Sequence, residues 1–297
     1  MPNVELAGRT RPTPFRHISL GTWRTAYDPS IYGSVTLRMD DALRYLDRFR
    51  AATGQRLTVT HMMAKVMGAV LEGVPDANAL LRFNRVYLRR DIGVFFQVAI
   101  EDPATGAIDL SGVKVDAPHR KSLREIVADF EDAAAKVRAR DRSQALERSR
   151  GGLLRIPALL IGFVMRLLSF LNYGLNLDLR WAGIPRDPFG GAMVTNIGSL
   201  GLEAAYVPLV PFSRVPLLVA VGAIEDIPVV RDGELTVGKA MRLYATFDHR
   251  VVDGVHAAKM VKILRAWFER PFEHFEPIEA PVAAIDHSSE SSTAIAK

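Results

Sequence analysis

The sequence predicts a single α/β domain, and three observations support that prediction. Segments with strand patterns alternate along the chain with segments whose apolar residues recur at helical spacing, and no internal repeat is visible. The 297 residues are enough for one large or two ordinary domains with a substantial core. A content of 48% hydrophobic and 24% charged residues is typical of globular rather than disordered proteins.

In the first half of the chain, strands and helices can be assigned from periodicity and stop signals. The strand patterns occupy residues 32–40, 91–102 and 106–116. The helical patterns occupy 41–54, which ends at a glycine, 58–74, which ends before Pro75, and 122–141. In the last of these helices, the residues expected to face the core are Leu123, Ile126, Val127 and Phe130.

In the second half, three strand patterns precede a closing helix. The strands are expected within 190–201, 216–230 and 239–254, and the helix within 254–271. Residues 1–13 are expected to form an arm on the surface or on a neighbouring subunit, and residues 14–272 to form the domain. Residues 273–297 contain Pro, Ser and Glu and are expected to be a disordered tail.

The segment from Leu153 to Trp181 is unusually apolar and is predicted to be a helical insertion. Between Ile156 and Leu177 its one charged residue is Arg166. A membrane span needs about 20 apolar residues, but a central charge, a proline and two glycines disfavour one here. We expect buried helices packed in the core or at a subunit interface. The alternative is an exposed apolar element that docks on a membrane or lines a pocket for a long acyl chain.

The composition excludes several classes of site. The chain has no cysteine, which removes disulfides, thiolate nucleophiles and cysteine metal sites, and fits a reducing compartment. Its net charge of +5 is spread along the chain without a basic block, so no nucleic-acid partner is expected. No histidine–carboxylate set has metal-ligand spacing. The N-terminus lacks the apolar region of a signal peptide, and the expected location is cytoplasmic, with membrane association left open.

The motif with the clearest chemical meaning is "FDHRVVDG", residues Phe247 to Gly254. It gathers Asp248, His249, Arg250 and Asp253 where a strand pattern gives way to a helical one. Two interpretations compete: a reactive site at a strand-to-helix junction, or a charged turn in solvent. A histidine suits the first, because an unperturbed imidazole pKa of about 6.5 allows general base catalysis near neutral pH.

"DHRVVDG", followed by "AAKMVKILRAWFERP", resembles the C-terminal motif of dihydrolipoyl acyltransferases, the catalytic domains of the transacylase subunit in 2-oxo acid dehydrogenase complexes. The stretches "LTVTHMMAKVMGAVLEGVPDANA", "GAIDLSGVKVDAPHRKSLREIV", "GGAMVTNIGSLG" and "VPLLVAVGAIEDIPVVRDGEL" follow in the order of that family. The resemblance covers most of residues 14–272. It implies the chloramphenicol acetyltransferase-like fold, a mixed β-sheet flanked by helices.

The resemblance also implies a role for each matching residue. His249 would be the general base, and Asp253 a structural partner that is salt-bridged to an arginine, here Arg16. Thr195 stands where the family has a serine that stabilises the oxyanion, and Asn196 lies beside it. Gly254 would let the chain turn tightly into the last helix. Outside the motif, His256 is expected on a helix face and His61 in the core.

The implied reaction is acyl transfer between coenzyme A, as the acyl-carrying cosubstrate, and a thiol, hydroxyl or amine acceptor. The family forms trimers or larger assemblies with the site between subunits, so His249 would face Thr195 of a neighbour. No lipoyl or subunit-binding domain is visible, and a free-standing catalytic domain without a covalent lipoyl group is expected. Two alternatives stay open: a non-catalytic oligomeric scaffold, and a membrane-surface acyltransferase for a lipid or secondary-metabolite acceptor.

Overall fold

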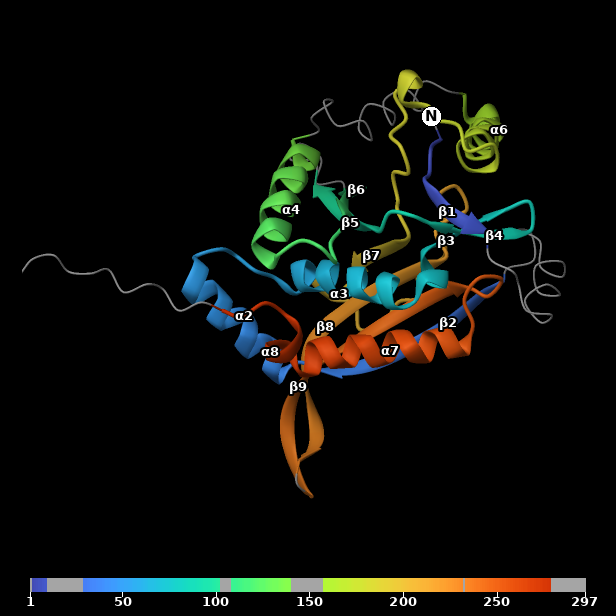
Figure 1. The fold of residues 1–297 in the computed structure, drawn as a ribbon. Coiled ribbons are helices and arrows are strands. Elements are labelled where there is room, and N and C mark those ends of the chain that lie inside the picture. The colour runs from blue at the N-terminus through green and yellow to red at the C-terminus, as the bar shows by residue number, and fades with distance from the viewer. Residues whose placement is uncertain (1, 10–28, 102–107, 140–156, 232, 279–297) are drawn as a thin grey trace, which may run out of the picture.

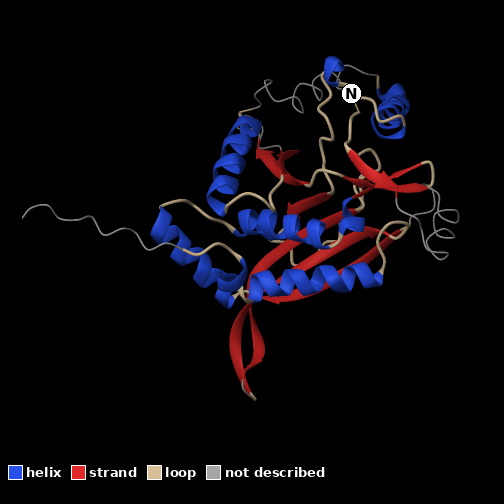
Figure 2. Cartoon of the chain, in the orientation of Figure 1, coloured by secondary structure: helices blue, strands red, loops and turns tan. Residues whose placement is uncertain are grey.

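The centre of the fold is a mixed six-stranded sheet with helices across one face (Figures 1 and 2). The computed structural model describes residues 2–9, 29–101, 108–139, 157–231 and 233–278. In sheet order the strands are β2 (Ser30–Arg38), β9 (Glu234–Asp248), β8 (Leu217–Arg231), β7 (Ala192–Asn196), β5 (Gly93–Glu101) and β6 (Ile108–Asp116). The β5–β7 and β7–β8 pairs are parallel and the others antiparallel. The predicted mixed sheet is therefore confirmed.

Helices on one face of this sheet enclose the main core. They are α2 (Asp40–Thr53), α3 (Val59–Gly73), α4 (Leu123–Arg138), α7 (Gly254–Glu269) and the short α8 (Pro271–His274). Gly54 ends α2 with a left-handed φ of 69°, and α3 stops before Pro75, as predicted. The four α4 side chains expected to face inward are all buried, which confirms that helix and its orientation.

The chain continues to pack beyond the predicted end of the domain. Phe275 is 4% exposed and its ring lies 4.9 Å from that of Trp267, centroid to centroid. The hydroxyl of Tyr45 donates a hydrogen bond to the carbonyl oxygen of Glu276 at 2.8 Å. The tail expected from residue 273 therefore begins with an ordered, packed segment, and residues 279–297 lie outside the described part of the chain.

The N-terminal residues belong to a second sheet and differ from the expected surface arm. β1 (Leu6–Arg9) pairs with β4 (Arg85–Arg89), which pairs with β3 (Ala79–Arg82). Val4 is 2% exposed, and the side chain of Asn3 donates to the carbonyl oxygen of Asn172 at 3.1 Å. The first residues thus bind the apolar insertion to the body of the domain.

The insertion has a buried part and an exposed part. It contains α6 (Ala158–Ser169), a π-helical turn η2 (Phe170–Gly174) and a 3-10 turn η3 (Arg180–Ala182). In η2, Asn172 and Tyr173 are fully buried, and both Nε and Nη2 of Arg82 donate to the carbonyl oxygen of Gly174 at 3.0 and 2.8 Å. The prediction that the insertion packs in the core is therefore confirmed for η2.

The expected packing in the core is wrong for α6, which stands away from the sheet in Figure 1, whereas packing at a subunit interface stays a prediction. Leu160, Phe163 and Leu167, spaced three and four residues apart, are 52%, 66% and 43% exposed. The apolar composition predicted burial, but the outer face of the helix has no partner within the described chain. No helix in the described ranges is long and apolar enough to cross a membrane.

A long hairpin extends away from the sheet. β8 and β9 pair from end to end apart from a register shift between Val221 and Ile224, whereas β2 pairs with β9 only from Ala240 to Asp248 and β7 with β8 only from Leu217 to Val221. The remainder of the hairpin projects from the domain (Figure 1). Its exposed apolar side chains are Val230, Leu235 and Val237.

Candidate active site

The "FDHRVVDG" motif lies where β9 ends and α7 begins. The backbone N–H of Asp248 donates to the carbonyl oxygen of Pro216, and that of His249 to the carbonyl oxygen of Pro29, each at 2.9 Å. These bonds fix the end of the strand against two neighbouring segments. The five-residue connection, 249–253, therefore starts from a rigid position, which a base needs if it is to be preorganised.

The orientation of the His249 ring is set by its own loop. Its Nδ1 lies 3.0 Å from the carbonyl oxygen of Val252. A carbonyl oxygen only accepts hydrogen bonds, so Nδ1 must carry the proton of the neutral ring. Nε2 then carries the lone pair, which makes it the basic nitrogen of this side chain.

The charges on both sides of His249 neutralise one another. Nε and Nη2 of Arg250 donate to the two carboxylate oxygens of Asp248 at 2.9 and 2.7 Å. Both side chains are nearly buried, with 12% and 11% exposed. The pair is therefore a bidentate clamp across the strand end rather than a solvated charged turn.

Asp253 holds the other end of the loop. Its carboxylate caps α7 by accepting from the backbone N–H groups of Val255 and His256 at 3.0 and 3.2 Å. The Nδ1 atom of His256 lies 2.6 Å from the same oxygen. The partner predicted for Asp253, Arg16, lies outside the described residues.

His256 has a larger structural role than the helix-face position expected for it. While its Nδ1 contacts Asp253, its Nε2 lies 3.2 Å from a carboxylate oxygen of Asp76, in the turn after α3. The imidazole therefore joins the start of α7 to η1 (Pro75–Asn78). The spacing of Asp253 and His256 as N-cap and N3 residue is a capping-box pattern that the sequence contained. Nothing in the sequence indicated Asp76.

Gly254 does not need the freedom expected of it. It is the first residue of α7, and a Cβ built on it would meet no atom within 4 Å. Its φ is not in the left-handed region. The turn into the helix is therefore set by the Asp253 cap and does not require glycine.

Thr195 and Asn196 lie at the end of β7, away from His249. Asn196 accepts the backbone N–H of Ser199 at 3.1 Å and so shapes the turn after the strand. Thr195 pairs with Ala220 of β8, which pairs with Tyr244 of β9. Tyr244 comes five residues before His249, and β7 lies two strands from β9. At about 3.3 Å per residue and about 4.8 Å per strand, the two backbones are roughly 19 Å apart. One chain therefore does not bring these two side chains together.

The insertion reaches the neighbourhood of the His249 loop. A small hollow of about 120 Å³ is lined by Asp248, Arg250 and Arg214, among others. Nε of Arg214 donates to the hydroxyl of Ser169, at the end of α6, at 3.2 Å. Burial, and after it the charge of Arg250, lowers the pKa of the Arg214 guanidinium. The exposed helix α6 is thus attached next to the motif.

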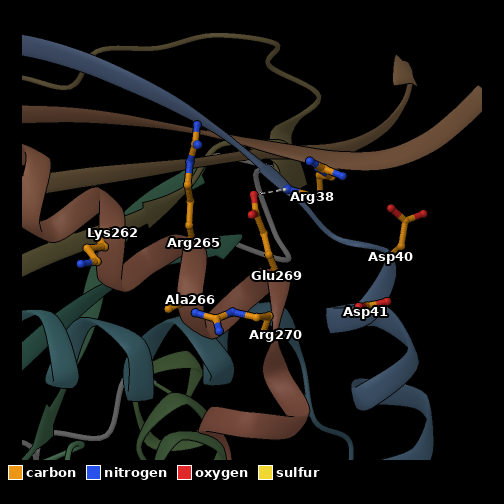
Figure 3. Close-up of a pocket in the computed structure, with 8 residues that line it drawn as sticks. All are labelled: Arg38, Asp40, Asp41, Lys262, Arg265, Ala266, Glu269 and Arg270. Carbon is orange, nitrogen blue, oxygen red and sulfur yellow. Dashed lines mark hydrogen bonds between the residues drawn. The ribbon is translucent and has the colours of Figure 1, made fainter. Parts of the chain in front are cut away.

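A larger hollow of the described chain lies elsewhere. It measures about 590 Å³ and lies at the far end of α7, lined mainly by charged residues that include Lys262 and Arg265 (Figure 3). In it, the backbone N–H of Arg38 donates to Glu269 at 3.4 Å. It contains no residue of the motif, so size alone does not identify the site.

The remaining histidine of interest is structural, as predicted. His61 is 1% exposed, and its Nδ1 accepts the backbone N–H of Thr58 in the capping box of α3. Burial is the largest cause that lowers its pKa to about 4, so the ring is neutral at pH 7. The described residues contain no group of three or more side chains able to hold a metal ion.

Comparison with known families points to one class of protein. The family described as 2-oxoacid dehydrogenases acyltransferase (catalytic domain) matches residues 188–275. The lipoamide acyltransferase component of the branched-chain alpha-keto acid dehydrogenase complex of Pseudomonas putida is 38% identical over 88 residues, which cover 29% of this chain and 20% of that protein. The dihydrolipoyllysine-residue acetyltransferase component of the Rhizobium meliloti pyruvate dehydrogenase complex is 24% identical over 82% of this chain and 45% of that protein.

The fold extends the similarity to the rest of the chain. A probable dihydrolipoamide acetyltransferase from Listeria monocytogenes superposes with a TM-score of 0.62 at 17% identity, over 92% of this chain and 99% of that one. The cubic core of a pyruvate dehydrogenase multienzyme complex gives a TM-score of 0.59 at 17% identity, over 90% and 94%.

The curated relatives are longer than this chain, which spans 20% of the Pseudomonas putida protein and 45% of the Rhizobium meliloti one. The matched segment 188–275 contains both Thr195 and the His249 loop. The resemblance of the motif and the predicted fold are thus confirmed by independent comparisons. Residues 188–275 thus match the catalytic domain of the 2-oxoacid dehydrogenase acyltransferases, and the chain has the fold of a probable dihydrolipoamide acetyltransferase and of a pyruvate dehydrogenase cubic core.

Proposed function

We propose that this protein is an acyltransferase that moves an acyl group between coenzyme A and a thiol, hydroxyl or amine acceptor. The observation that carries the proposal is the geometry of His249. Its Nδ1 faces the carbonyl oxygen of Val252 at 3.0 Å, which leaves Nε2 as the basic nitrogen. Because the loop is held at both ends by Asp248 and Asp253, that nitrogen has a defined direction.

In the proposed reaction, Nε2 of His249 takes the proton of the acceptor as its sulfur, oxygen or nitrogen attacks the thioester carbonyl. The new bond to the carbonyl carbon gives a tetrahedral oxyanion. When this intermediate collapses, the carbon–sulfur bond to coenzyme A breaks. The departing thiolate takes the proton back from the imidazolium, which restores the neutral base.

The oxyanion donor in this proposal is the hydroxyl of Thr195. Within one chain it is roughly 19 Å from His249 at the backbone, given about 3.3 Å per residue and about 4.8 Å per strand. The donor must therefore come from a second copy, and we propose a trimer or larger oligomer whose sites lie between subunits. The similarity in fold to a cubic multienzyme core supports an oligomer.

The test is release of coenzyme A from acetyl-, butyryl- and octanoyl-coenzyme A, with dihydrolipoamide, an alcohol and an amine as separate acceptors. We expect release by the unmodified protein and a loss of about 10²–10⁴-fold in His249→Ala. His274→Ala changes a histidine in α8, at the opposite end of α7, and serves as the matched control. Full activity in His249→Ala would refute the assignment of the base. Intact trimers that neither bind nor cleave any thioester would favour the scaffold alternative.

A second candidate is favoured by the exposed apolar face of α6: the same chemistry at a membrane surface, on a lipid or secondary-metabolite acceptor. Phe163 at 66% exposure is suited to contact with a bilayer interface. The test is flotation with liposomes of the unmodified chain and of the triple variant Leu160→Ser, Phe163→Ser, Leu167→Ser. Deleting the whole insertion is unsuitable, because Asn172 and Tyr173 are buried. Absence of flotation by the unmodified chain would refute this candidate.

A further inference from the structure

The domain contains an apolar hollow next to the His249 loop. It measures about 190 Å³ and lies between the helix-covered face of the sheet and the helices α3 and α7. Val219, Leu243 and Phe247 line it from the sheet, and Met67, Met260 and Leu264 from the helices. All of these side chains are buried. No charged side chain lines the hollow, so its chemistry suits an apolar group.

Small residues keep the hollow open. Gly33, Ala245, Ala257 and Ala258 occupy positions on its wall. A Cβ built on Gly33 would approach the Phe247 ring at 3.6 Å, an ordinary contact, so a larger residue could be accommodated there. On α7, leucine in place of alanine would cost little helix propensity. The space is therefore a consequence of the side chains present and not of the backbone.

The hollow adjoins the proposed base on two sides. Phe247, which lines it from β9, precedes His249 by two residues. Ala257, which also lines it, lies in the first turn of α7, the helix that follows the His249 loop. Gly33 and Val35 of the edge strand β2 and Ala257 of α7 line it and are only partly buried, so the hollow lies near the surface between β2 and α7. An apolar chain can thus enter from solvent close to the junction.

We propose that this hollow binds the apolar tail of the acyl substrate, a chain of about six to eight carbons. The size follows from comparison with apolar cavities of about 150 Å³, which accept benzene. This inference rests on the proposed acyl transfer and specifies its substrate as a medium-chain rather than an acetyl thioester. An apolar tail of this length can belong to an acyl thioester or to a free fatty acid, and the tests below distinguish these two ligands.

Binding can be measured without any turnover, because two methionines line the hollow. The protein is labelled with ¹³C-methyl methionine and titrated with octanoate or acetate while NMR spectra are recorded. We expect the methyl signals of Met67 and Met260 to shift with octanoate and not with acetate. Met193 packs in a separate cluster and is the internal control. Repeating the titration with octanoyl-coenzyme A under non-turnover conditions, without acceptor, shows whether the thioester enters as well as the free acid.

Two leucine variants of one helix provide a matched pair. Ala257→Leu fills the hollow, whereas Ala266→Leu adds the same side chain to α7 at the separate charged hollow. We expect Ala257→Leu to abolish the octanoate shifts and to lower the ratio of octanoyl- to acetyl-coenzyme A release by about tenfold. Ala266→Leu should preserve both. If Ala257→Leu does not fold, Gly33→Ala narrows the same space with an ordinary 3.6 Å contact.

The outcomes distinguish this inference from the proposed function. Octanoate shifts at Met67 and Met260 without release of coenzyme A by any variant would support the site and refute acyl transfer. Release of coenzyme A without those shifts, and with an unchanged chain-length ratio in Ala257→Leu, would support acyl transfer and overturn the site. Octanoate shifts that persist in Ala257→Leu would also overturn it, because the ligand would then be bound elsewhere.

Discussion

The His249 loop and the end of β7 contribute to the same proposed reaction but are held in different ways. The loop is fixed at both ends, by the Asp248–Arg250 clamp and by the Asp253 cap. Thr195 is held mainly by the sheet itself, in register with Ala220. The first arrangement orients a ring that must accept a proton, while the second only needs to present a hydroxyl. The comparison teaches that, in the proposed reaction, one chain would supply the two halves of a site from two separate places.

After the loss expected in His249→Ala, the next largest effect is expected at the less constrained half. Thr195→Ala removes the proposed oxyanion donor and should lower coenzyme A release by about 10²–10³-fold. Thr195→Ser keeps the hydroxyl and serves as the control, with activity close to that of the unmodified protein. Equal activity in the alanine and serine variants would show that the hydroxyl is not used.

Mixing two inactive variants tests whether the halves belong to different subunits. His249→Ala and Thr195→Ala are unfolded together and refolded as mixed oligomers. If each site takes its base from one subunit and its donor from the next, about a quarter of the sites are intact in a random mixture. Coenzyme A release should then recover to about that fraction. No recovery in confirmed mixed oligomers would place both groups in one chain and contradict the separation seen here.

A smaller effect is expected when the loop loses its cap. Asp253→Ala removes the acceptor for the N–H groups of Val255 and His256 and should lower the free energy of unfolding by about 1 kcal/mol. Asp253→Asn retains a capping oxygen and should recover most of that stability. Urea unfolding measures both. If coenzyme A release falls in Asp253→Ala and returns in Asp253→Asn, the cap is needed to position His249. Equal stability of the two variants and the unmodified protein would refute capping.

The buried side chain of His61 makes the free energy of unfolding depend on pH. Its pKa falls from 6.5 in the unfolded chain to about 4 in the fold, because burial disfavours the charged ring. The unfolded state therefore binds more protons between these values, so stability is fully present above pH 6.5 and is lost as pH falls toward 4. The loss is about 3 kcal/mol. His61→Gln should flatten the difference in unfolding free energy between pH 7 and pH 4.5, and an unchanged difference would contradict this account.

Much of the fold followed from periodicity. The helix α4 and its inward face were predicted because apolar residues recur at the helical repeat, and the ends of α2 and α3 because glycine and proline stop helices. The strands β5 and β6 form where strand patterns were predicted, and they pair antiparallel with each other. These features depend on local chemistry, which the sequence contains.

What depends on distant partners could not be predicted. His256 contacts Asp76, a residue 180 positions away, and no local pattern joins them. The apolar run of α6 indicated burial, but composition does not say which face meets the domain. Gly254 suggested a strained turn, whereas the Asp253 cap makes the turn instead. Of the residues assigned by resemblance, Arg16 lies outside the described chain, so its pairing stays a prediction.

The projecting β8–β9 hairpin has a practical consequence. Beyond Ala240 and Val221 its strands pair only with each other in the described sheet, so both outer edges offer backbone N–H and carbonyl groups to another strand. Exposed Val230, Leu235 and Val237 make such pairing more favourable. The hairpin therefore carries a template for edge-to-edge aggregation. If the protein forms the proposed oligomer, dilution, which favours separate subunits, should be the condition under which it precipitates first.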